Sequence, residues 1–160
     1  MQPSVHGGAR LAAMALVATA LMTSTSGCAS PGVTKAELFV TRDQRIVVHG
    51  ASLHRGEAIL HVENDDGAPH VVVLARLAPD VSALPVVDGT VPVGRPSAQS
   101  YSGAGYHVVA KSERMAAYFN GPNRVRAEFH VYLRPGRYLV FANARGDYSR
   151  GLYTMLTVPA

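Results

Sequence analysis

The sequence has little charge and almost no cysteine. Charged residues make up 16% of its 160 residues and hydrophobic residues 48%, a balance that excludes a disordered chain and favours one domain with a buried core. The only cysteine, Cys28, excludes an intrachain disulfide and a structural zinc site built on several thiolates. The formal net charge of +4 is spread along the chain without a run of basic residues, so nucleic acid is not an expected partner.

Motifs of the common enzyme classes are absent as well. The chain contains no Gly-x-Ser-x-Gly nucleophile elbow and no His-Glu-x-x-His metal motif, and Gly103-Ala104-Gly105 lacks the strand and helix that flank a phosphate-binding loop. The adjacent carboxylates Asp65 and Asp66 are interpreted as part of a solvated turn. We therefore expect no catalytic residue and a protein that is not an enzyme.

Residues 1–27 have the pattern of an export signal. The basic residue Arg10 precedes Leu11–Met22, a run of twelve residues that are nearly all apolar. As a helix this run would extend about 18 Å, which is short of the roughly 30 Å hydrocarbon core of a membrane. It is therefore interpreted as the centre of a signal peptide and not as a transmembrane helix.

Cys28 follows this signal in the segment Thr25-Ser26-Gly27-Cys28. The segment resembles a bacterial lipobox, although Thr25 stands where that motif usually has leucine or another aliphatic residue. The resemblance implies that Cys28 is lipidated and becomes the mature N-terminus, with residues 28–36 as a tether. The protein would then be anchored by lipid to the extracytoplasmic face of a bacterial membrane. The alternative is an ordinary secreted protein in which Cys28 has no such role.

The remaining residues, 37–160, are expected to form one β domain. Residues 57–63 and 125–133 alternate between apolar and polar side chains, which is typical of strands with one buried face. Short apolar runs predict strands buried on both sides, and turn-forming residues separate the strands. The other expected strands are 37–41, 45–49, 71–74, 106–110, 138–141 and 152–158. Strands at such regular spacing predict an antiparallel sandwich or small barrel.

Two segments depart from the strand pattern. Residues 112–119 are expected to form at most one short helix, with Ser112 as its N-cap. Residues 78–102 are richer in proline, glycine and serine, and are expected to form an excursion on the surface.

The strand pattern resembles that of a known family. Residues 56–70, Gly-Glu-Ala-Ile-Leu-His-Val-Glu-Asn-Asp-Asp-Gly-Ala-Pro-His, are similar to the strand and turn that lead to the first copper ligand of cupredoxins. Residues 133–141 resemble the Leu-x-Pro-Gly-x-Tyr start of the penultimate strand in the same family. The likeness covers about residues 37–158 and implies a Greek-key, cupredoxin-like β-sandwich of the bacterial secreted type. His70 stands at the first ligand position.

Residues 142–153 resemble the cupredoxin ligand loop in length but not in ligands. The family pattern is Cys-Asn-x-x-Gly-His-Tyr-x-x-Gly-Met, and this chain has Ala142 for the cysteine, Asp147 for the histidine and Leu152 for the methionine. A blue copper centre depends on its copper–thiolate bond, and alanine has no donor atom. We therefore expect a degenerate copper site.

Other residues of this loop keep the family pattern. They are Asn143, Gly146, Tyr148, Gly151 and Tyr153. One interpretation is that they only hold the loop, with the tyrosine hydroxyls at the surface; the other is that this end of the sandwich binds something other than redox copper.

Three hypotheses for the function follow. The first is a non-catalytic binding or accessory module of the cell envelope, without a resident cofactor, anchored to the membrane and serving an unidentified envelope protein. The second is copper or zinc handling through His70 and Asp147, since imidazole and carboxylate groups suit both metals; the alternative at this position is a His–Asp hydrogen bond with Leu152 packed beside it. The third is electron transfer with atypical ligands.

Overall fold

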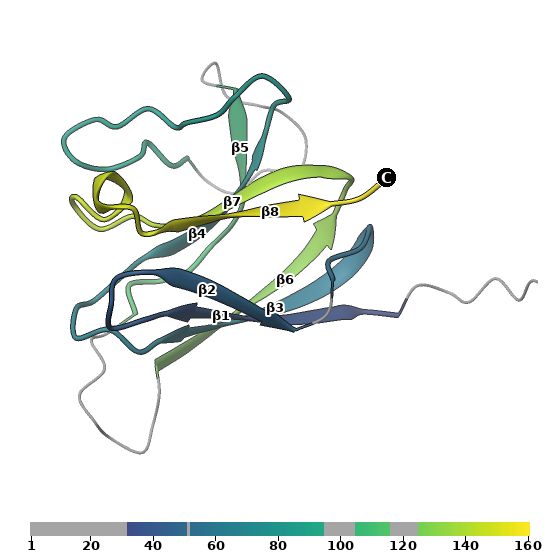
Figure 1. The fold of residues 1–160 in the computed structure, drawn as a ribbon, viewed down its shortest axis with the longest axis horizontal. Helices are drawn as coiled ribbons and strands as arrows, with labels where there is room; N and C mark the ends of the chain where they lie inside the picture. Colours follow the sequence, from purple (N-terminus) through teal and green to yellow (C-terminus); the bar gives the residue numbers. More distant parts are fainter. Residues whose placement is uncertain (1–31, 51, 95–104, 116–124) are drawn as a thin grey trace, which may run out of the picture.

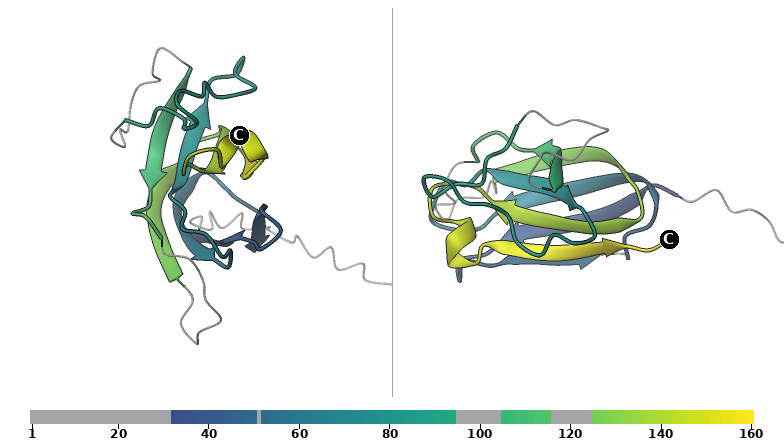
Figure 2. Two further views of the ribbon diagram at one scale, coloured as in Figure 1. Left: turned by 90° about the vertical axis from the view of Figure 1, so that its left-hand side faces the viewer. Right: turned by 90° about the horizontal axis from the view of Figure 1, so that it is seen from above.

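The computed structural model describes residues 32–50, 52–94, 105–115 and 125–160, which form a sandwich of two four-stranded sheets (Figures 1 and 2). One short 3₁₀ helix, η1 (Tyr148–Arg150), lies between the last two strands. The all-β prediction with at most one short helix is confirmed for these residues. The strands are β1 (Thr34–Val40), β2 (Ile46–Gly50), β3 (Gly56–Asn64), β4 (Val72–Leu77), β5 (Tyr106–Lys111), β6 (Val125–Leu133), β7 (Gly136–Ala142) and β8 (Tyr153–Val158).

The first sheet, which we call the open sheet, has the strand order β2-β1-β3-β6. β1 pairs antiparallel with β2 but parallel with β3, so the expected antiparallel sandwich contains one parallel pair. The parallel pair arises because β2 folds back along one edge of β1 and the chain then crosses to the other edge. β3 pairs antiparallel with β6 along its full length, from Gly56 opposite Leu133 to Asn64 opposite Val125.

Strand β6 shows why the open sheet could be recognised in the sequence. Phe129 and Leu133 are buried in the core between the sheets, whereas the alternate residues Arg126, Glu128 and His130 are exposed. The expected alternation over residues 125–133 is therefore confirmed. One face of this sheet packs on the core and the other meets solvent, as period-two sequences indicate.

The second sheet, which we call the covered sheet, has the order β5-β4-β7-β8 and is antiparallel throughout. Its central strands are buried on both faces because residues 78–94 run across the outer face (Figure 2, right). Leu84 and Val91 from this segment pack in a second apolar cluster with Val73 and Phe141. The interpretation of residues 78–102 as a surface excursion was therefore wrong for residues 78–94, which add a layer to the core.

The ends of the predicted segments also differ from the structure. β1 begins at Thr34, so residues 34–36, expected in the tether, belong to the open sheet. Residues 112–115 are not helical, and the rest of the expected helix at 112–119 lies outside the described residues, as do the signal peptide and Cys28. In the described parts of the chain, no helix is long and apolar enough to cross a membrane.

Candidate functional site

His70 lies at one end of the sandwich, just before β4. Its backbone forms a two-way bridge with Met115: the His70 N–H donates to the Met115 carbonyl at 3.0 Å, and the Met115 N–H donates to the His70 carbonyl at 2.7 Å. The residue is only 2% exposed. Its imidazole is therefore held inside the protein, close to the loop that joins β7 to β8.

Both ring nitrogens of His70 contact carboxylates. Nδ1 lies 2.8 Å from Oδ2 of Asp147, and Nε2 lies 2.8 Å from Oδ2 of Asp66. The structure thus brings together His70 and Asp147, the two residues that were predicted to face each other. An ionised carboxylate only accepts hydrogen bonds, so the imidazole makes both contacts at once when each ring nitrogen carries a proton.

Asp66 is the residue that the sequence analysis missed. It was interpreted as part of a solvated turn, but it is only 8% exposed and its carboxylate faces His70. The turn holds it there: the Gly67 N–H donates to Oδ1 of Asp66 at 2.7 Å, and the Asp66 N–H donates to the side-chain oxygen of Asn64 at 3.0 Å. The available signal was the spacing of four residues between Asp66 and His70 across a tight turn.

Asp147 is anchored within its own loop as well. Its Oδ2 accepts the Ala144 N–H at 3.0 Å, and its Oδ1 accepts a guanidinium N–H of Arg150 at 2.7 Å. Burying a carboxylate is costly unless charged or polar partners replace water. Here imidazole, guanidinium and backbone N–H groups supply those partners. We call His70, Asp66, Asp147 and Arg150 the His70 network.

The other two positions that the likeness to cupredoxins assigned to ligands carry hydrocarbon side chains. Ala142 and Leu152 are fully buried, and the Ala142 N–H donates to the Leu152 carbonyl at 2.9 Å. Neither side chain has an atom that can bind a metal. Across the described residues, no group of three or more His, Cys, Asp or Glu side chains is arranged to hold a metal ion. These residues do not fit a His₂Cys copper centre.

The retained residues of the loop hold it in place. Gly146 and Gly151 have positive φ angles of 84° and 94°, which favour glycine. The Asn143 side chain accepts the Val91 N–H at 2.7 Å and donates to the Val91 carbonyl at 2.9 Å. The Tyr148 hydroxyl was expected at the surface but accepts the Leu84 N–H at 3.0 Å. These bonds fasten the loop to the segment that covers the second sheet.

Histidines outside the site have separate surroundings. His61 and His130 point outward from the open sheet, as alternation predicted, and both contact the carboxylate of Glu128. His107 lies half-buried in β5, where burial, and then the positive charges of Arg76 and Arg134, lower its pKa below the ordinary value. Neither group belongs to the His70 network.

Comparison with known proteins yields structural neighbours only. No family model and no curated protein matches the chain. A dithionite-reduced auracyanin from the photosynthetic bacterium Roseiflexus castenholzii superposes with a TM-score of 0.55 at 14% identity, covering 79% of this chain and 98% of that one. Auracyanin B gives a TM-score of 0.47 at 19% identity, covering 79% and 88%. Together with the two-sheet architecture, the first likeness shows that this chain has a cupredoxin-like β-sandwich fold.

Proposed function

We propose that the protein is a lipid-anchored, cupredoxin-like module of the cell envelope that carries no blue copper and does no catalysis. The observation that carries this proposal is that both ring nitrogens of His70 contact a buried carboxylate. Its two ring nitrogens contact Asp66 and Asp147, each at 2.8 Å, which supports a hydrogen-bonded network at the position where the cupredoxin likeness implies a metal ligand. The loop that carries Asp147 would then serve as a contact surface for an envelope protein.

Metal titration tests this proposal. Calorimetry with Cu(II) and with Zn(II) uses a Cys28→Ala chain, so that no thiol contributes, and its His70→Ala and Asp147→Ala variants. His130→Ala is the matched control, because His130 is exposed on the open sheet and lies outside the network. We expect no submicromolar binding, and the same weak binding in the His70→Ala and Asp147→Ala variants. Submicromolar binding that both variants lose and the control keeps would overturn the proposal.

Copper or zinc handling is the second candidate, and the 2.8 Å contact between His70 and Asp147 is the observation that favours it. A divalent ion held between His70 Nδ1 and Asp147 would take the place of the proton in that contact, while Nε2 could keep its contact with Asp66. The titration above decides between the two candidates. An intense blue absorption band in the copper-loaded chain would instead indicate electron transfer with atypical ligands.

The membrane anchor needs its own test. Expression of the full chain in a bacterial host, followed by mass spectrometry of the mature protein, is expected to show acyl chains on Cys28, because multiple acyl chains are needed for stable attachment. The Cys28→Ala variant is the control and is expected to leave the membrane fraction. A mature N-terminus elsewhere, or an unmodified Cys28, would show an ordinary secreted protein.

A further inference from the structure

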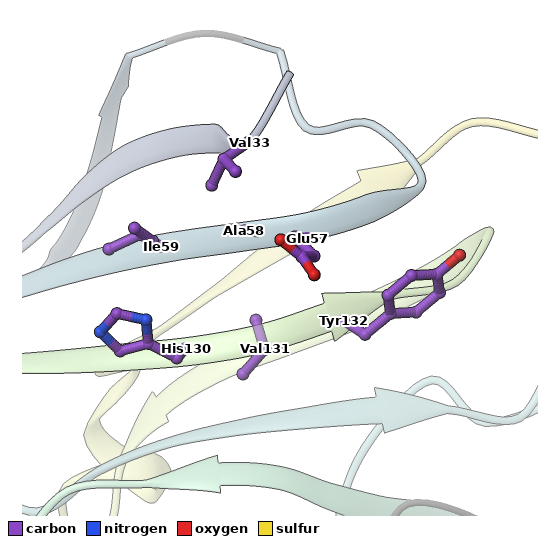
Figure 3. Close-up of a pocket in the computed structure, with 7 residues that line it drawn as sticks. All are labelled: Val33, Glu57, Ala58, Ile59, His130, Val131 and Tyr132. Atoms are coloured by element: carbon purple, nitrogen blue, oxygen red, sulfur yellow. The ribbon is translucent and has the colours of Figure 1, made fainter. Parts of the chain in front are cut away.

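A groove lies at the end of the sandwich far from His70. Its wall is formed by the outer side of β3 and β6 and by the residue that precedes β1 (Figure 3). The groove has a volume of about 380 Å³, and a second hollow that shares Val33, Glu57 and Tyr132 adjoins it. Tyr132 is 57% exposed and Val33 is 46% exposed. These are large apolar surfaces in a place where the open sheet otherwise carries charge.

The groove lies beside the point where the chain enters the sandwich. Val33 lines it, and only five residues of chain lead from Cys28 to Val33. Five residues span at most about 18 Å even when fully extended. If Cys28 carries the lipid anchor, as proposed above, the membrane surface must therefore lie within that distance of Val33.

The charges at this end complement an anionic membrane. Arg55 lines the adjoining hollow, and the exposed Lys35 lies opposite Ile59 in the sheet register. Glu57 is the acidic side chain in the wall of the groove. Basic residues near a negatively charged bilayer are attracted to its headgroups. A tyrosine ring suits the same boundary, because its apolar body can enter the interface while its hydroxyl stays in water.

The His70 network lies at the opposite end. Strand β3 runs from Glu57 at the groove to Asn64, a length of about 23 Å at the usual rise per residue. Beyond Asn64 comes the turn that holds Asp66 and His70. Figure 1 shows η1, in the loop that carries Asp147, at the end of the sandwich away from the start of β1.

We infer that the groove end of the open sheet rests against the headgroups of an anionic bilayer, with Val33 and Tyr132 in the interface and the His70 network directed away from the membrane. This inference rests on the proposed lipid anchor. It gives the module a defined orientation, which presents the loop at residues 143–151 to the aqueous compartment.

Depth-dependent quenching tests this orientation. The chain has no tryptophan, so a single introduced tryptophan reports on its own position. The full chain is produced in a bacterial host as Tyr132→Trp or as Tyr153→Trp, and the mature protein is reconstituted into vesicles that contain phosphatidylglycerol, with or without brominated acyl chains. Tyr153 is the matched control because it is 47% exposed. It begins β8 at the other end of the sandwich, where its ring contacts Tyr148.

We expect brominated lipid to reduce the fluorescence of the tryptophan at position 132 by about twofold or more and to leave that at position 153 unchanged, because only the former reaches the interface. Equal quenching at the two positions, or none at either in vesicle-bound protein, would overturn the orientation. Concentration-dependent shielding of position 132 without lipid would also overturn it and would identify a second copy as the occupant.

Failure of the anchor itself has a different signature. If Cys28 is not lipidated, the mature protein does not float with vesicles, and its Cys28→Ala variant behaves in the same way. Because Cys28 is the only cysteine, its thiol can then be coupled to a maleimide lipid in the same vesicles. The quenching pattern of the coupled protein confirms or overturns the orientation, whatever the cell does to Cys28.

Discussion

The open and covered sheets have the same number of strands but meet solvent differently. On the open sheet, many outward residues are exposed, and charged side chains there pair with one another, such as Arg126 with Glu63 at 2.8 Å. On the covered sheet, residues 78–94 bury the outward side chains of β4 and β7 in a second apolar cluster. The difference teaches that one sandwich can have two cores when a long connection folds back over a sheet.

Residues 78–94, which we call the cover, also support the candidate site. Asn143 and Tyr148, in the loop that carries Asp147, bind the backbone of Val91 and Leu84. The cover is itself fixed by Arg137 of β7, whose guanidinium donates to the Val81 carbonyl. Hydrogen bonds and apolar packing from the covered sheet therefore hold the shape of this loop.

We expect the largest effect when an aromatic residue on the outer face of each sheet is replaced. Phe141→Ala should lower the free energy of unfolding by about 3–5 kcal/mol, because it empties the second cluster. Phe39→Ala, on the outer face of the open sheet, should cost about 1 kcal/mol, since Phe39 is already partly exposed to water. Urea denaturation followed by circular dichroism measures both values. Equal losses would break the comparison between the sheets.

The next contrast is between a buried and an exposed ion pair. Asp147→Ala should lower the free energy of unfolding by about 3 kcal/mol, because it leaves His70 and Arg150 without their shared carboxylate. Glu128→Ala removes a carboxylate from the solvent side of the open sheet and should cost about 0.5 kcal/mol or less. Thermal and urea denaturation provide the measurement. A small effect of Asp147→Ala would show that the network contributes little to stability.

A third pair of variants probes the cover. Leu84→Ala should cost about 2–3 kcal/mol, because Leu84 is buried against the covered sheet. Val87→Ala in the same segment should cost less than about 0.5 kcal/mol, since Val87 is exposed. Hydrogen exchange of β4 and β7 amides should also rise in Leu84→Ala only. If both variants behave alike, residues 78–94 are not a structural layer.

The smallest effect concerns pH and His107. Its pKa is lowered in the folded protein by burial and by nearby arginines, so the unfolded chain takes up a proton more readily. The free energy of unfolding should therefore fall as the pH drops through about 6.5, and level off below the folded pKa. Because His107 is partly exposed, its contribution to the pH-dependent free energy of unfolding is about a few tenths of a kcal/mol. His107→Gln should remove that contribution between about pH 7.5 and about pH 5; parallel curves for both proteins would contradict the assignment.

The sequence predicted the fold more completely than the candidate site. Alternation located β3 and β6, and the likeness to cupredoxins correctly implied that His70 and Asp147 would lie together. The sequence did not identify Asp66 as part of the site, because adjacent aspartates before a glycine look like an ordinary solvent-facing turn. The sequence also did not predict that Leu84 is buried. The proline and glycine near Leu84 indicate a loop, but they do not indicate what that loop covers.

The sequence by itself determined which residues can form strands, where turns separate them, and that no thiolate stands in the loop at residues 142–153. These are local properties of side-chain periodicity and donor chemistry. Only the tertiary structure decided that Asp66 and Asp147, the latter 77 residues from His70, hold one imidazole from both sides. It also decided that residues 78–94 become part of the core. Both outcomes depend on how distant segments pack, and no local pattern encodes that.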